Sequence, residues 1–198
     1  MKEAGQWGFA DAVPAPTVIP SYEGTALKSS LGLQADSSEA NLRQIGFGQG
    51  SALVTPIQVL LWYGALALNN DEAVGAPHIV DYIEDPNTVE DAKYIETRPA
   101  LPAMFAGYGK TQETLRAAFA GAAEAYKLKS DKLKAIYGKT GTATQPDGKN
   151  TVMLAFSFIT QKDESYVAII SQSGISNTSA VLKEPARELL KHTLEVVG

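Results

Sequence analysis

Apolar residues along the chain follow a helical period in some segments and an extended period in others. The stretch from Thr55 to Leu68 is apolar around most of its circumference, which predicts a buried helix that Thr55 can cap and Pro56 can begin. A second helix is predicted from Thr111, with apolar residues on one face at Leu115, Ala118, Phe119, Ala122, Ala123 and Tyr126. A terminal helix after residues 176–179 carries an apolar stripe of Leu182, Leu189, Leu190, Leu194 and Val197.

Three strands are predicted between the second and the terminal helix. They cover residues 133–143, 151–160 and 166–172. The first two are separated by residues 144–148, whose Pro-Asp-Gly sequence favours a turn, and the last two by a short polar segment. Because short connections join antiparallel strands, we expect a meander. The predicted fold class is therefore α+β, an antiparallel sheet covered by helices.

The other segments predict irregular structure. Prolines and glycines interrupt residues 10–44, and polar residues fill 34–41. Residues 46–50, with three glycines, predict a turn. Residues 71–109 contain four prolines and predict loops with short extended pieces.

Composition excludes several classes of function. The chain has 198 residues and a net charge of −5, which argues against nucleic acid as a partner. It has no cysteine and only two histidines, so thiolate zinc sites are excluded and no metal or organic cofactor is implied. No apolar run approaches the roughly 18–20 residues that cross a bilayer, and the first residues lack the layout of a signal peptide. We therefore expect a soluble chain without an anchor of its own.

The residues that carry chemistry lie in the segment Tyr137-Gly138-Lys139-Thr140-Gly141-Thr142-Ala143, on the first predicted strand. A lysine that faces a cleft can hold an anionic group. Gly141 lets a ligand approach the backbone, and Thr140 and Thr142 add hydroxyl donors. This combination suits the binding of a carboxylate beside a carbonyl group under attack. The alternative is an edge strand with a solvated lysine.

The same segment resembles the Lys-Thr-Gly signature of serine β-lactamases and penicillin-binding proteins. Residues 46–58, GFGQGSALVTPIQ, are similar to a GxGQG…VTPxQ stretch of the transpeptidases. β-Lactamases lack this stretch. Pro77-His78-Ile79-Val80 adds a further similarity. In order and spacing, nearly the whole chain resembles the C-terminal part of a high-molecular-weight penicillin-binding protein transpeptidase domain.

The resemblance implies a D,D-transpeptidase that cross-links peptidoglycan stem peptides through an acyl-enzyme on a serine, which β-lactams also acylate. It implies a catalytic role in proton transfer for Lys139, and binding of the D-Ala-D-Ala or β-lactam carboxylate by Thr140 and Thr142. Gly141 would keep the strand open, and the Thr142 N–H would form half of an oxyanion hole. Strict alternation places Lys139 and Thr140 on opposite faces, so their joint presence in the site rests on the resemblance alone.

Two signatures of the family are absent from the sequence. No lysine has a serine three positions before it, and the only aliphatic hydroxyl at that spacing is Thr25, before Lys28. The Ser-x-Asn signature is also absent. We therefore expect residues 1–198 to be the C-terminal segment of one incomplete domain, with three of the five strands that are usual in the family. We expect this segment to be inactive alone. Its expected partners are the missing N-terminal part and, through an exposed edge at 166–172, a second copy.

Other interpretations follow from the missing nucleophile. The chain could be a non-catalytic relative, a β-lactam sensor or scaffold that binds peptide ends, although a sensor would retain the serine–lysine pair. A β-lactamase-like hydrolase is disfavoured by the match at 46–58. We expect Trp62 and Tyr63 to be core residues, His78 to be packed or hydrogen-bonded, and the lysines at 127, 129, 132 and 134 to form a solvated face. The family places the parent protein in the cell envelope, at the outer face of the cytoplasmic membrane.

Overall fold

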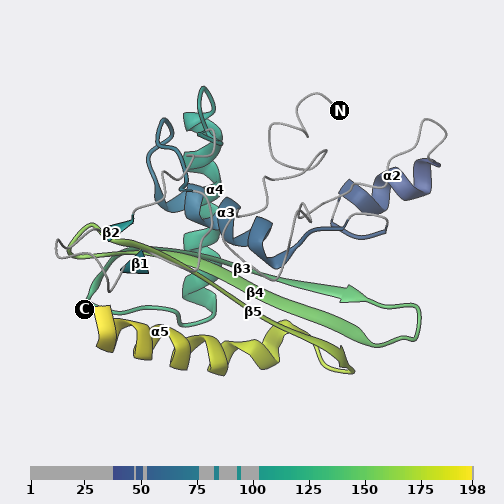
Figure 1. Ribbon diagram of the computed structural model, residues 1–198. Helices are drawn as coiled ribbons and strands as arrows, with labels where there is room; N and C mark the ends of the chain where they lie inside the picture. The colour runs from purple at the N-terminus through teal and green to yellow at the C-terminus, as the bar shows by residue number, and fades with distance from the viewer. Residues whose placement is uncertain are drawn as a thin grey trace. The chain divides into compact units, whose positions relative to one another are not determined.

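The computed structural model describes residues 38–46, 48–50, 53–75, 83–84, 93–94 and 103–197. The chain divides into two compact units. The first comprises residues 1–57 and 73–102, and the second comprises residues 58–72 and 103–198. The second unit contains the three-stranded sheet and the residues of the Lys-Thr-Gly segment (Figure 1).

The first unit contains helix α2 (Glu39–Gly46) and the antiparallel pair β1 (Ile83–Glu84) and β2 (Lys93–Tyr94). Ser38 caps α2, because its Oγ accepts a hydrogen bond from the Asn41 N–H at 3.2 Å. The prediction of irregular structure is therefore wrong for residues 39–44. Residues 10–37 of that segment lie outside the described residues, and so does the segment that contains His78.

A glycine turn follows α2, as predicted. The Gly48 N–H donates to the Ile45 carbonyl at 2.9 Å, and the Gln49 N–H donates to the Gln44 carbonyl at 2.9 Å. Gly48 and Gly50 have φ angles of +81° and +71°, a backbone region that other residues rarely adopt. These glycines therefore have a structural role.

Helices α3 (Pro56–Ala67) and α4 (Gly109–Ala125) confirm the first two predicted helices. Side chains of α4 bind the carbonyl groups at the C-terminal end of α3, which no longer have partners within the helix. Gln112 Nε2 donates to the carbonyls of Ala65 (2.9 Å) and Leu68 (2.8 Å). Arg116 Nε donates to Leu66 O at 2.7 Å, and Arg116 also binds Leu68 O. Polar α4 side chains thus fix the end of α3.

The buried face of α4 differs from the predicted one for this reason. Ala118, predicted on the apolar face, is exposed, whereas Gln112 is only 2% exposed. An amide side chain is buried here because the α3 carbonyls satisfy its N–H groups. Tyr63 of α3 stacks on Phe119 of α4, with ring centroids 5.7 Å apart, which confirms its packing role.

Three strands form the predicted antiparallel sheet, in the order β3-β4-β5. They are β3 (Leu133–Thr144), β4 (Asn150–Thr160) and β5 (Ser165–Ile175). The predicted turn closes the β3–β4 hairpin, with a 2.9 Å hydrogen bond from the Gly148 N–H to the Gln145 carbonyl. Gly148 has a φ of +77°, which explains the glycine. The sheet matches the predicted α+β fold class.

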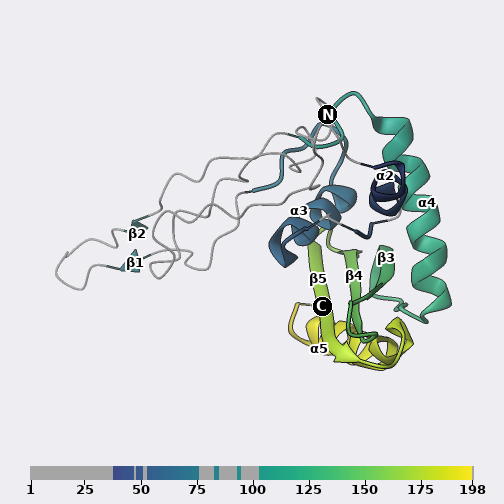
Figure 2. The same cartoon turned by 90° about the vertical axis from the view of Figure 1, so that its right-hand side faces the viewer.

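A 3₁₀-helix η1 (Ser179–Leu182) and helix α5 (Lys183–Val197) cover one face of the sheet (Figure 2). Pro185 lies in the first turn of α5, where its missing N–H has no helical partner. Leu189, predicted in the apolar stripe, is 37% exposed, and Ala186 is buried instead. The buried side chains that form the main core come from α4, the loop that follows it, β4, η1 and α5: Ala123, Leu128, Val152, Leu154, Phe156, Phe158, Leu182, Ala186, Leu190 and Leu194.

Within the described residues, no helix is both long enough and apolar enough to cross a bilayer.

Candidate functional site

The Lys-Thr-Gly residues lie on β3, which is an edge strand of the three-stranded sheet. The register places Thr140 opposite Leu154 and Thr142 opposite Val152, both of which are fully buried. The two threonine side chains therefore point to the face that α5 and η1 cover. Lys139 lies on the opposite face and is exposed. The structure thus shows the alternation predicted for Lys139 and Thr140.

The Lys139 ammonium lies against the backbone of its own strand. Its Nζ donates a hydrogen bond to the Thr140 carbonyl at 2.7 Å. No carboxylate of the described residues pairs with it. An ammonium has three N–H donors, so donors remain that can bind an anion. The exposed face of β3 therefore carries an uncompensated positive charge.

The hydroxyl groups of both threonines have partners. Thr140 Oγ1 lies 2.6 Å from the hydroxyl of Tyr126, at the C-terminal end of α4. Thr142 Oγ1 accepts the N–H of Ser179, the first residue of η1, at 3.2 Å. The two side chains connect β3 to α4 and to η1.

The packing of the described residues explains one of the two glycines of β3 and leaves the other unexplained. A Cβ at Gly138 would lie 3.3 Å from the Phe156 Cβ and 3.7 Å from the Ala123 Cβ, so close packing requires glycine there. A Cβ at Gly141 would meet nothing within 4 Å, and Gly141 has no positive φ. Since glycine weakens a strand, its presence at 141 has no explanation in the packing of the described residues.

The ring of Tyr137 lies next to α4. The Arg116 guanidinium lies 5.7 Å from the Tyr137 ring centroid, at cation–π distance. Residues 137, 138 and 140 of β3 therefore lie against the end residues or side chains of α4. Lys139 and Gly141 are exposed on the same strand.

Tyr126 is a residue that sequence reasoning placed only on the apolar face of a helix. Its ring also makes a cation–π contact with the Lys183 ammonium, whose Nζ lies 5.0 Å from the ring centroid. Arg187 Nη1 donates to the Tyr126 carbonyl at 3.5 Å. A tyrosine at the end of an apolar helix face signals a hydroxyl that needs a partner, but the sequence does not identify Thr140 as that partner.

The arrangement suits an anionic, extended ligand. An edge strand presents backbone N–H and C=O groups that can pair with a peptide in β conformation. Lys139 supplies positive charge at that strand, and Gly141 leaves room beside the backbone. No group of three or more metal-ligating side chains occurs in the part of the chain that the structure describes.

Comparisons with known proteins identify relatives of this fold. The family described as the penicillin binding protein transpeptidase domain matches residues 23–191. Among solved structures, the chain is similar to penicillin-binding protein 2B from Streptococcus pneumoniae (strain R6), with a TM-score of 0.65 and 18% sequence identity. That match covers 98% of this chain and 32% of the other, so the chain spans about a third of that protein. No curated protein sequence gives a significant match.

Proposed function

The chain belongs to the penicillin-binding protein transpeptidase domain family, and from this premise we propose that it carries the substrate-binding strand of a peptidoglycan D,D-transpeptidase. The proposed ligand is the D-Ala-D-Ala end of a stem peptide, or a β-lactam that takes its place. Lys139, Thr140, Gly141 and Thr142 form the proposed site. The proposed function belongs in the cell envelope, and we propose the outer face of the cytoplasmic membrane as the location of the parent protein.

The observation that carries the proposal is that Lys139 and Gly141 are both exposed on the same face of β3. The lysine has no carboxylate partner among the described residues, and the fold there gives no reason for a glycine at 141. A cation beside a strand position without a side chain suits a peptide that ends in a carboxylate.

Each residue has a proposed role in substrate binding. Lys139 attracts the anionic end of the substrate and takes part in proton transfer at a neighbouring serine. The Thr142 N–H polarises the carbonyl oxygen under attack, as half of an oxyanion hole. For the Thr140 and Thr142 hydroxyls to bind the carboxylate, each must exchange or share its present partner, Tyr126 or the Ser179 N–H.

The nucleophile of the proposed reaction is a serine outside these 198 residues. No lysine in the sequence has a serine three positions before it, and Thr25 lies outside the described residues. A lysine adjacent to the hydroxyl is what activates the nucleophile in this chemistry. We therefore propose that the chain alone binds the ligand without forming an acyl-enzyme.

A titration of the ¹⁵N-labelled chain with an N-acetylated peptide ending in D-Ala-D-Ala tests the proposal. We expect saturable amide shifts at residues 139–142, and a loss of affinity of about tenfold in Lys139→Ala. Lys149→Ala, which removes an exposed lysine from the β3–β4 turn, is the matched control and should bind like the original chain. Shifts confined to other segments, or equal losses in both variants, would contradict the proposal.

Labelled penicillin provides a second measurement. After denaturing electrophoresis, the chain alone should carry no covalent label. A labelled band that survives denaturation would show a nucleophile within these residues and overturn that part of the proposal.

A second candidate function, non-catalytic binding of peptide ends, is favoured by the same missing Ser-x-x-Lys signature. The coding sequence upstream of Met1 distinguishes the two. An in-frame Ser-x-x-Lys followed by Ser-x-Asn supports the transpeptidase, whereas a stop codon supports the non-catalytic function.

We also propose that the outer edge of β5 is a pairing surface for the missing part of the domain or for a second copy. In the described sheet, β5 pairs only with β4. Size-exclusion chromatography at micromolar concentrations should show self-association of the chain alone. A compact monomer throughout that range would contradict pairing with a second copy.

A further inference from the structure

A basic cleft lies on the second unit, between the segment that joins α4 to β3 and helix α5. Its volume is about 430 Å³. Five of its lining side chains are cationic and one is acidic: Lys127, Lys129, Lys132, Arg187, Lys191 and Glu195. We use the name basic cleft for this set. In a chain with a net charge of −5, such a local excess of positive charge stands out.

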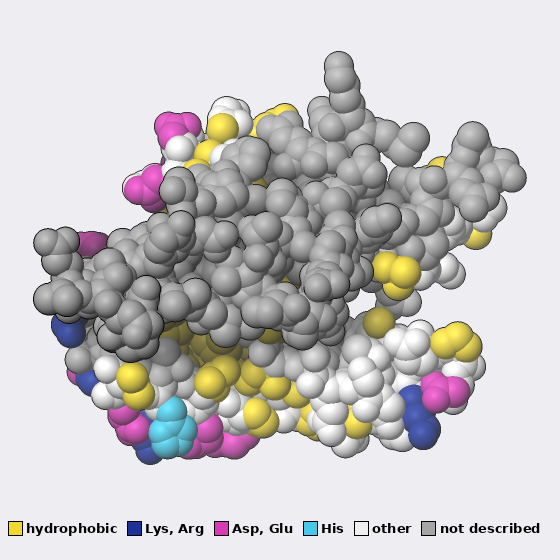
Figure 3. Space-filling model, viewed as in Figure 1, with side chains coloured by type: hydrophobic (Ala, Val, Ile, Leu, Met, Phe, Trp, Pro, Cys, Tyr) yellow, Lys and Arg dark blue, Asp and Glu magenta, His cyan; other side chains and the backbone are white. Residues whose placement is uncertain are grey.

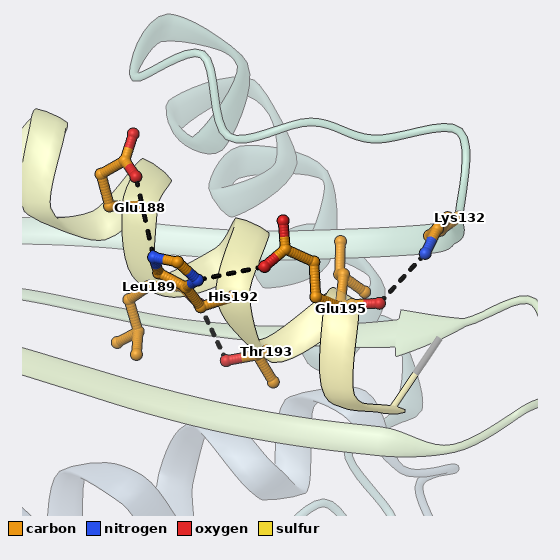
Figure 4. A network of polar contacts seen from close by, with 7 residues as sticks. Lys132, Glu188, Leu189, His192, Thr193 and Glu195 are labelled. Carbon is orange, nitrogen blue, oxygen red and sulfur yellow. Dashed lines mark hydrogen bonds and ion pairs between the residues drawn. The ribbon is translucent and has the colours of Figure 1, made fainter.

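Four of the five cations have no carboxylate partner among the described residues, and three of these four also bind no backbone group through their side chains. Lys127, Lys129 and Lys191 form no ion pair or side-chain hydrogen bond with the described residues. The one acidic lining residue, Glu195, instead lies 3.1 Å from His192 Nδ1 (Figure 4). These three ammonium groups line one cleft without a neutralising carboxylate among the described residues, which favours the binding of an anion there.

The other two cations are held in place by the fold. Lys132 Nζ donates to the Leu194 carbonyl at 3.1 Å, at the C-terminal end of α5 where a positive charge is favoured (Figure 4). Arg187 binds the Glu184 carboxylate and donates to the Tyr126 carbonyl at 3.5 Å. The walls of the cleft are therefore tied to each other by backbone-directed hydrogen bonds.

Helical spacing aligns the α5 side of the cleft. Arg187, Lys191 and Glu195 are four residues apart and form one stripe. Leu190 and Leu194 lie at the base of the cleft and are only 3% and 4% exposed. These two leucines therefore offer little apolar area to a ligand. Other acidic side chains and the histidine gather on the outer surface of α5 (Figure 3).

Lys127 stands in a position that favours glycine. Its φ is +59°, and two hydrogen bonds, from Lys127 N to Glu124 O (2.8 Å) and from Leu128 N to Ala123 O (3.0 Å), form a Schellman motif. Glycine is the preferred residue there because a Cβ is strained in this conformation. A lysine at this site costs stability, yet it places a cation at the rim of the cleft.

We propose that the basic cleft binds a phosphate group, as a phosphomonoester or phosphodiester anion. A phosphate carries up to two negative charges and several acceptor oxygens, which suit a cleft lined by three ammonium groups without partners among the described residues. The small volume and the negative net charge favour one or two phosphate groups over a long polyanion. This site is separate from Lys139–Thr142 and does not depend on the function proposed for them.

Titration of the ¹⁵N-labelled chain with inorganic phosphate and with pyrophosphate tests the proposal. We expect saturable shifts in residues 127–132 and 187–195, tighter binding of pyrophosphate, and affinity that falls as salt rises. Lys129→Gln and Lys191→Gln should each weaken binding about threefold to tenfold, as expected for the loss of one nearby charge. Lys149→Gln removes the same charge from the distant β3–β4 turn and should leave binding unchanged.

Lys127→Gly separates binding from folding. It should raise the melting temperature, because it relieves backbone strain, while it weakens phosphate binding by a similar factor to Lys129→Gln. A variant that is more stable and yet binds less cannot owe its loss of binding to misfolding. Unchanged binding in Lys127→Gly, or an equal loss in Lys149→Gln, would overturn the proposal.

Two further measurements identify the source of the phosphate. Sedimentation with vesicles of phosphatidylcholine containing phosphatidylglycerol, compared with pure phosphatidylcholine, detects a lipid headgroup. Vesicle binding that is lost in Lys129→Gln supports a lipid phosphate, and binding of phosphate and pyrophosphate without vesicle binding supports a soluble one. Shifts of equal size with sodium chloride at the same ionic strength, or binding to neither, would overturn the site.

Discussion

The hydroxyl of Tyr126 lies 2.6 Å from Thr140 Oγ1 and joins the end of α4 to the strand that carries the Lys-Thr-Gly residues. Tyr126→Phe removes this hydrogen bond and keeps the ring. We expect the free energy of unfolding to fall by about 0.5–1.5 kcal/mol. Because the Thr140 hydroxyl then lacks its protein partner, affinity for a D-Ala-D-Ala peptide should rise by roughly twofold to fivefold.

A double-mutant cycle with Thr140→Val isolates the interaction. Urea unfolding of both single variants and the double variant should give a coupling energy of about 1 kcal/mol. Additive effects would mean that the hydroxyls do not interact. Weaker peptide binding in Tyr126→Phe would mean that Tyr126 holds Thr140 in its binding position.

The two glycines of β3 should respond in opposite ways to alanine. Gly138→Ala forces a Cβ to 3.3 Å from the Phe156 Cβ, and we expect a loss of about 1–3 kcal/mol in unfolding free energy. Gly141→Ala enters open space and should keep or raise stability by up to about 1 kcal/mol. It should nevertheless weaken peptide binding roughly tenfold, or about 1.4 kcal/mol. Gly141→Ala that binds the peptide normally would remove the proposed reason for this glycine.

The sequence predicted the helices and strands of the second unit well, because their apolar spacing reflects burial on one face. It failed where a polar side chain is buried by a specific partner. Gln112 is the main example, since only the end of α3 explains why an amide is 2% exposed. Helix α2 was missed because its cap, Ser38, stands in a polar stretch without apolar periodicity.

The candidate site was predictable only in part. The residues of the motif, and the opposite faces of Lys139 and Thr140, follow from the sequence and from strand alternation. The partners of the threonine hydroxyls do not, because Tyr126 and Ser179 are brought to β3 by the packing of α4 and η1. The lysines at 127, 129, 132 and 134 are exposed, as predicted for a solvated face. The sequence does not show that residues 127–132 meet α5 at a cleft, because that convergence is a tertiary feature.

The cap that Gln112 provides for α3 can be tested by removing its amide. Gln112→Leu leaves the carbonyls of Ala65 and Leu68 without these hydrogen bonds and should reduce the unfolding free energy by about 1–3 kcal/mol. Gln172→Leu makes the same chemical change at an exposed position of β5 and should change stability by less than about 0.5 kcal/mol. Urea denaturation that gives equal effects for both would contradict the capping role.

The phenol of Tyr63 should make the fold sensitive to alkaline pH. Burial, with a smaller contribution from Tyr126, raises the pKa of Tyr63 above its ordinary value of 10.0. Below pH 10 the phenol is protonated in both the folded and the unfolded chain, and its contribution to stability is fully present. Above pH 10 the unfolded chain loses this proton while the folded chain retains it, so stability falls as pH rises. At pH 11 the loss from this group should be roughly 1 kcal/mol relative to pH 8.

Tyr63→Phe keeps the stacking on Phe119 and removes the titrating group. The difference in unfolding free energy between the original chain and Tyr63→Phe, measured in urea at pH 8 and pH 11, cancels the titration of the lysines, which both chains share. A difference that is the same at both pH values would show that the phenol ionises equally in the folded and unfolded states.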